Sequence, residues 1–144
     1  MRKRDSGQSS KVFLVEIVNN MVRTGLLLGS FFALMTVVLG AFGVHALKDQ
    51  LNEYGKSIYE KGIFYQMFHS LAIVLVVILN EYLDGVNLSL SIWMFTFGIL
   101  LFSGSLYILA LTQIKWLGAI TPIGGLLFIL GWGIIFYRTF NSTI

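Results

Sequence analysis

The chain has 144 residues, of which 56% are hydrophobic and only 12% are charged, and its mean hydropathy is +0.80. Soluble domains are roughly half apolar and a quarter charged, so a chain of this composition could not hide its apolar surface in water. We therefore expect one domain in a lipid bilayer. The sequence has no cysteine, which excludes disulfides, thiolate metal sites and cysteine nucleophiles. The formal charge of +3 comes without a basic patch interleaved with aromatic residues, so nucleic acid is not an expected partner.

Residues 1–20 are predicted to form a polar tail that is disordered or lies at the membrane interface. The apolar run 12–18 is broken by Glu16, so it is too short and too polar to span a membrane, but it could extend the first helix. The basic residues of the tail could bind anionic lipid headgroups, although a solvated tail is the preferred interpretation. These residues are Arg2, Lys3, Arg4 and Lys11.

The first predicted span covers about 25–47, a stretch without charge that is long enough to cross the roughly 30 Å hydrocarbon core. Small residues recur along it every three or four positions, which places them on one helix face where a neighbouring helix can approach closely. They are Gly25, Gly29, Ala33, Thr36, Gly40 and Gly43. A cleaved signal peptide is the alternative, but the preceding segment is long and contains acids, and a stripe of small residues has no role in a cleaved peptide.

Residues 48–61 form the only charge-dense connection, and their pattern predicts a short amphipathic helix lying in the interface. The second span is predicted at about 63–83. Its first turns contain Gln66 and His69, which are one turn apart and are expected to share a helix face.

The third span is predicted at about 90–112 and the fourth at about 116–137. Ser91, Gly98, Ser105 and Thr112 repeat every seven residues, which favours a second small-residue seam. Pro122 is expected to bend the fourth span near its start, because it frees the carbonyl of the residue four positions back. Across the chain, the residues expected to serve helix packing are Gly29, Gly40, Gly43, Gly98, Ser105, Gly118, Pro122 and Gly125.

Residues 21–144 are therefore predicted to form an all-α, four-span membrane bundle. An even number of spans puts both termini on one side, with six Lys and Arg residues there against four on the other, which weakly favours termini in the cytoplasm. If translation starts at Met21, four of the six are absent and the orientation reverses.

Three polar side chains form the candidate site: His45, Gln66 and His69. The short connection brings both histidines toward one membrane face, where they could act as a proton relay or a metal pair. We prefer a structural role for each, because two ligands without cysteine make an incomplete zinc site unless Asp49 or a second subunit contributes. Neither a catalytic triad, a carboxylate pair nor a phosphate-binding glycine loop is found in a plausible context, so we expect no enzyme, no cofactor and no metal.

Four ordered blocks of this sequence resemble the YgdD/YwdK family of small bacterial inner-membrane proteins of uncharacterised function (domain of unknown function 423), which has eukaryotic transmembrane relatives. The first two blocks are Gly40 to Lys48 and Tyr65 to Ala72. The third is Phe102 to Tyr107 with Ala110 to Thr112, and the fourth is Gly118 to Gly125 with Gly131 and Trp132. The resemblance implies four spans in a bacterial plasma membrane, and it places His45, Gln66 and His69 inside family motifs. It implies no activity. Family members usually begin near the position of Met21, so we hypothesise that Met21 is the native start.

These observations favour a multi-pass plasma-membrane protein that is not an enzyme. We expect it to act through helix packing, either with another membrane protein or with copies of itself. The alternative is a small oligomeric channel or transporter whose polar path is lined by Gln66, His69, Ser105 and Thr112.

Overall fold

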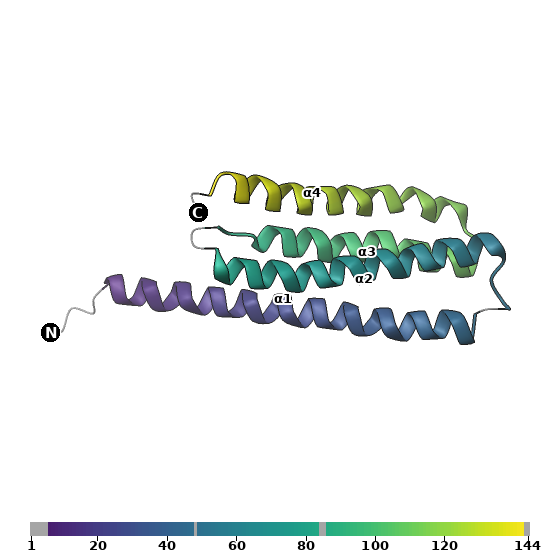
Figure 1. The fold of residues 1–144 in the computed structure, drawn as a ribbon, viewed down its shortest axis with the longest axis horizontal. Coiled ribbons are helices and arrows are strands. Elements are labelled where there is room, and N and C mark those ends of the chain that lie inside the picture. The colour runs from purple at the N-terminus through teal and green to yellow at the C-terminus, as the bar shows by residue number, and fades with distance from the viewer. Residues whose placement is uncertain (1–5, 48, 84–85, 143–144) are drawn as a thin grey trace.

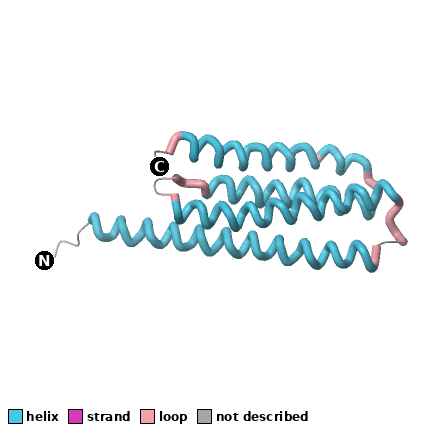
Figure 2. The backbone as a smooth tube through the Cα atoms, in the orientation of Figure 1, coloured by secondary structure: helices cyan, strands magenta, loops and turns pink. Residues whose placement is uncertain are grey.

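The computed structural model describes residues 6–47, 49–83 and 86–142, and these residues form four long α-helices and one short 3-10 helix (Figure 1). Short loops join the helices, and the described part of the chain contains no strand (Figure 2). The predicted all-α fold is confirmed. The elements are α1 (Ser6–His45), α2 (Glu53–Tyr82), α3 (Ser89–Thr112), η1 (Lys115–Ala119) and α4 (Thr121–Phe140).

Four segments are long and apolar enough to cross a membrane: Asn19–Gly43, Glu53–Tyr82, Ser89–Thr112 and Lys115–Phe140. The shortest has 24 residues, or about 36 Å of helix, against roughly 30 Å of hydrocarbon. Large apolar side chains cover the outside of the bundle, including Val37 at 71% exposure and Phe136 at 74%. In water this surface would cost free energy, whereas in lipid it is the expected exterior, so the chain is a multi-pass membrane protein.

The helices are arranged so that each packs mainly on its neighbours in the sequence (Figure 1). α2 packs on α3, α3 packs on α4, and α1 packs on α2 with only slight contact to α3. Both ends of the chain lie at the same end of the bundle, and the first turns of α1 extend beyond the other helices. α1 and α4 are therefore the edge helices, and each keeps an outer face that no other described helix covers.

Two apolar clusters form the core, one toward each membrane face. The cluster toward the chain termini includes Phe32, Ile73, Val76, Leu88, Ile92, Phe95 and Phe128. The other, toward the α1–α2 loop, includes Leu47, Leu51, Ile58, Tyr59, Leu106, Leu109 and Leu117. Phe102 packs against both clusters, so the core is continuous along the bundle axis.

The charge-dense connection does not form the separate amphipathic helix that the sequence predicts; from Glu53 onward it is the beginning of α2. Asn52 caps this helix, since its side-chain oxygen accepts a 2.7 Å hydrogen bond from the Gly55 amide. Gly55 and Gly62 do not interrupt the helix because both are buried against α3. α2 thus begins ten residues before the predicted span, and Lys48 lies outside the described residues.

The prediction of a bend at Pro122 is also wrong. The chain leaves α3 through Gln113, in the left-handed conformation with φ 57°, and then forms η1 before α4 begins. Pro122 lies in the first turn of α4, where its missing amide breaks no helical hydrogen bond. The fourth span is therefore a 3-10 turn followed by an α-helix.

The predicted tail divides into two parts. Residues 6–20 are helical and continuous with the rest of α1, as in the alternative that extends the first helix. Residues 1–5 lie outside the described residues.

Candidate functional site

Gln66 is the centre of a hydrogen-bond network that joins α1, α2 and α3. Its side chain is 4% exposed and lies about 20 Å along α2 from the start of the helix, deep in the span. The amide nitrogen donates to the Phe32 carbonyl of α1 at 3.0 Å, and the amide oxygen accepts from the Tyr107 hydroxyl of α3 at 3.0 Å. Thr36 donates to the same Phe32 carbonyl at 2.8 Å. One buried side chain in the middle of an apolar span therefore connects three helices.

His69 faces α4 instead, and both of its ring nitrogens are occupied. Nδ1 lies 2.9 Å from the Tyr65 carbonyl, which can only accept, so Nδ1 carries the proton. The indole nitrogen of Trp132 can only donate, and it donates to Nε2 at 3.3 Å. The ring also stacks on Phe128 with centroids 3.5 Å apart. These partners define a neutral imidazole that a metal or a proton relay could use only after the hydrogen bonds were broken.

His45 is not part of this arrangement. It is exposed at the C-terminal end of α1, where it lines a groove with Lys56 and Glu60 of α2. Glu60 and His69 are nine residues apart on α2, or about 14 Å along the axis. The structure thus separates the three residues of the predicted polar site: His45 lies near the loop, Gln66 faces α1 and α3, and His69 faces α4.

Most of the tightly packed glycines accommodate an aromatic ring from the neighbouring helix. The pairs are Gly43 with Tyr59, Gly62 with Tyr107, Gly98 with Phe128 and Gly131 with Phe95. A methyl group at Gly43 would lie 2.5 Å from the Tyr59 ring, too close for any real side chain. In this position Tyr59 donates a 2.8 Å hydrogen bond to the Leu39 carbonyl of α1. Gly43 and Gly62 therefore leave the space in which Tyr59 and Tyr107 reach across the bundle.

The predicted packing residues differ in how closely they pack. A methyl group at Gly29 would lie 2.7 Å from Val74 and 3.1 Å from the Ser70 carbonyl, so α1 and α2 approach closely there. Ser105 lies 2.9 Å from the Thr121 hydroxyl and so links α3 to the start of α4. At the remaining glycines of the predicted set a methyl would meet its nearest neighbour only at 3.8 to 3.9 Å, which is ordinary contact. These are Gly40, Gly118 and Gly125.

Sequence reasoning did not identify Tyr107 and Trp132 as partners of Gln66 and His69. The available signal was chemical: a tyrosine or indole inside an apolar span needs a hydrogen-bond partner, and so does a glutamine or histidine. Spacing could not pair them, because Gln66 and Tyr107 are 41 residues apart and His69 and Trp132 are 63 apart. Within the described residues, no group of three or more His, Asp or Glu side chains is placed to hold a metal ion.

Comparison with known proteins places this arrangement in a family. A family model described as "Protein of unknown function (DUF423)" matches residues 39–125, which include all three polar residues of the predicted site. A UPF0382 membrane protein of Staphylococcus haemolyticus is 45% identical over 116 residues, covering 81% of this chain and 94% of that protein. One from Staphylococcus saprophyticus is 47% identical, covering 81% and 96%, and YwdK of Bacillus subtilis is 44% identical, covering 74% and 88%. No solved structure matches the chain.

Proposed function

Because the chain belongs to this UPF0382 (DUF423) family of bacterial membrane proteins, we propose that it is a non-enzymatic membrane component that acts by helix packing. Its partner is another membrane protein or a second copy of the chain. The observation that carries the proposal is the engagement of Gln66 and His69, the two polar side chains best placed for chemistry. Gln66 bonds to α1 and α3, and His69 bonds to its own helix and to Trp132 of α4, which leaves neither side chain free for a substrate.

The edge helices provide the surface for such packing. α1 and α4 each pack mainly on one neighbour, and their outer faces carry exposed apolar side chains such as Leu34 at 58% and Leu126 at 58%. Lipid also covers such faces, so the support comes from the packing order: each edge helix keeps an outer face on which another helix can pack through van der Waals contact. A single chain has two of these faces, so it can join an assembly from either side.

The channel alternative has less support from the geometry. Its four polar residues do not follow one path: Gln66 faces α1 and α3, while His69 and Ser105 face α4. Thr112 is exposed and donates to the Ile108 carbonyl of its own helix. A polar pathway would require these bonds to open.

Cysteine scanning in cells tests the proposal cleanly, because the natural sequence has no cysteine. Leu34→Cys on α1 and Leu126→Cys on α4 sample the edge faces, and Leu100→Cys samples an exposed position on α3 with 51% exposure. After thiol cross-linking, gentle extraction and mass spectrometry, we expect one defined adduct from an edge position and none from α3. Equal labelling at all three positions, or no adduct at any, would contradict the proposal.

A further inference from the structure

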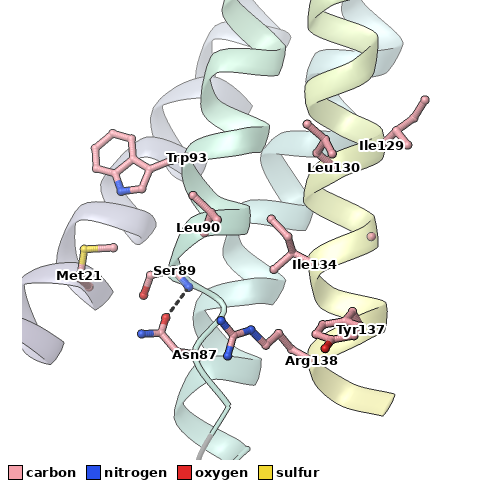
Figure 3. Close-up of a pocket in the computed structure, with 11 residues that line it drawn as sticks. Met21, Asn87, Ser89, Leu90, Trp93, Ile129, Leu130, Ile134, Tyr137 and Arg138 are labelled. Atoms are coloured by element: carbon pink, nitrogen blue, oxygen red, sulfur yellow. Dashed lines mark hydrogen bonds between the residues drawn. The ribbon is translucent and has the colours of Figure 1, made fainter. Parts of the chain in front are cut away.

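A groove runs along the bundle at the end that holds the chain termini, between the two edge helices (Figure 3). α3 forms its floor with Leu90 and Trp93, α4 forms one wall, and Met21 of α1 lies at the other side. It exists because α1 and α4 do not pack along each other in the described chain. Its volume of about 890 Å³ falls within the roughly 300–1,000 Å³ typical of small-ligand sites.

The groove is polar at one end and apolar at the other. Asn87, Ser89 and Arg138 lie at the membrane-surface end, while Leu130 and Ile129 lie toward the bundle centre (Figure 3). Arg138 and Ile129 are nine residues apart, or about 14 Å along α4, which is close to half of the roughly 30 Å hydrocarbon core. The groove therefore has the polarity and depth of one lipid leaflet.

The charged residue of the groove indicates which class of lipid fits it. Among the described residues that line the groove, Arg138 is the only charged one, and it lies at the same end of the groove as Asn87 and Ser89 (Figure 3). Guanidinium groups bind phosphate oxygens through paired N–H donors, and basic residues at a membrane surface attract anionic lipids.

We propose that this groove binds one anionic glycerophospholipid. Its phosphate lies at Arg138 and Asn87, and one acyl chain lies along Leu90, Leu130 and Ile129. The groove adjoins the α4 packing face that Leu126 samples, since Leu126 and Leu130 are four residues apart on one helix face. The lipid count and the cysteine cross-linking are separate readouts, so either proposal can fail without the other.

Two pairs of variants test the charge and the shape of the site. Arg138→Gln removes the cation, and Lys115→Gln removes an exposed cation from η1, at the other end of the bundle. Gly133→Leu places a bulky side chain in the groove, where a methyl group meets nothing within 4 Å; Gly104→Leu adds the same volume at an open position that does not line it. Each purified protein is incubated with mixed phosphatidylglycerol and phosphatidylcholine micelles, and retained lipid is counted by native mass spectrometry.

We expect the natural protein and both controls to retain one phosphatidylglycerol in preference to phosphatidylcholine. Arg138→Gln should lower this retention about fivefold, as expected for one basic contact worth about 1 kcal/mol. Gly133→Leu should abolish it. Equal retention of both lipids, or full retention by either groove variant, overturns the proposal. Gly133→Cys provides a further test, because a disulfide-linked dimer through that position would show that a second chain occupies the groove.

Discussion

Replacing Gln66 with methionine tests whether a buried polar side chain holds this bundle together. Methionine is unbranched and of similar length, so it keeps the packing volume while removing both interhelical hydrogen bonds. Such bonds contribute about 0.6 kcal/mol on average in a membrane, with a maximum near 1.7, so two of them give about 1.2 kcal/mol. The Tyr107 hydroxyl also loses its acceptor in a dry environment, which adds roughly 1 kcal/mol. We expect Gln66→Met to lower the free energy of unfolding by about 2 kcal/mol.

The assay is equilibrium unfolding in mixed micelles by titration with a denaturing detergent, followed by circular dichroism. Tyr107→Phe removes one of the same two bonds, so the double variant should lose less stability than the two single variants together, by about 0.6 kcal/mol or more. Thr112→Val is the control, because its exposed hydroxyl bonds only the Ile108 carbonyl of its own helix and the Ile114 amide of the loop that follows. Unchanged stability of Gln66→Met, or strict additivity of the pair, would refute the reasoning.

Three further predictions use the same unfolding assay. Gly131→Ala would push a methyl into the Phe95 ring and should lower the free energy of unfolding by about 1–3 kcal/mol. Gly133→Ala adds a methyl in open space and should raise that free energy by up to about 1 kcal/mol. Equal unfolding midpoints for the two variants would contradict the packing account. His69→Phe keeps an aromatic ring but loses both imidazole hydrogen bonds, so a loss of about 1 kcal/mol is expected and an unaffected midpoint would count against their role. Deletion of residues 1–20 should leave the unfolding midpoint unchanged, because Val22 is the first residue of α1 that packs on the core among those whose side chains are described; a lower midpoint would show that the first turns stabilise the bundle.

Hydropathy was enough to predict four spans, because an uncharged apolar stretch of this length has few possible structures other than a membrane-spanning helix. It could not give the helix ends, since it reports membrane depth and a helix can continue into the interface. α2 shows this best: its charged first turns lie before the predicted span, yet Asn52 caps them. Helix propensity counts Gly55 and Gly62 against a continuous helix there, whereas their burial against α3 overrides that propensity.

The candidate site was only partly predictable. Gln66 and His69 stood out because polar side chains are rare inside apolar spans. Their separation was not foreseen, because residues three apart differ by about 60° around a helix, enough to face different neighbours. Only the packing order shows that one turns toward α1 and α3 and the other toward Trp132 of α4.

The most direct test of the packing function is the mass of the particle that the protein forms when membranes are extracted into polymer-bounded lipid discs without detergent. One chain contributes 16.1 kDa. Native mass spectrometry should find either a multiple of that mass or one chain together with a second protein in fixed ratio. A particle that contains a single chain and lipid alone, at natural expression level, would contradict the account.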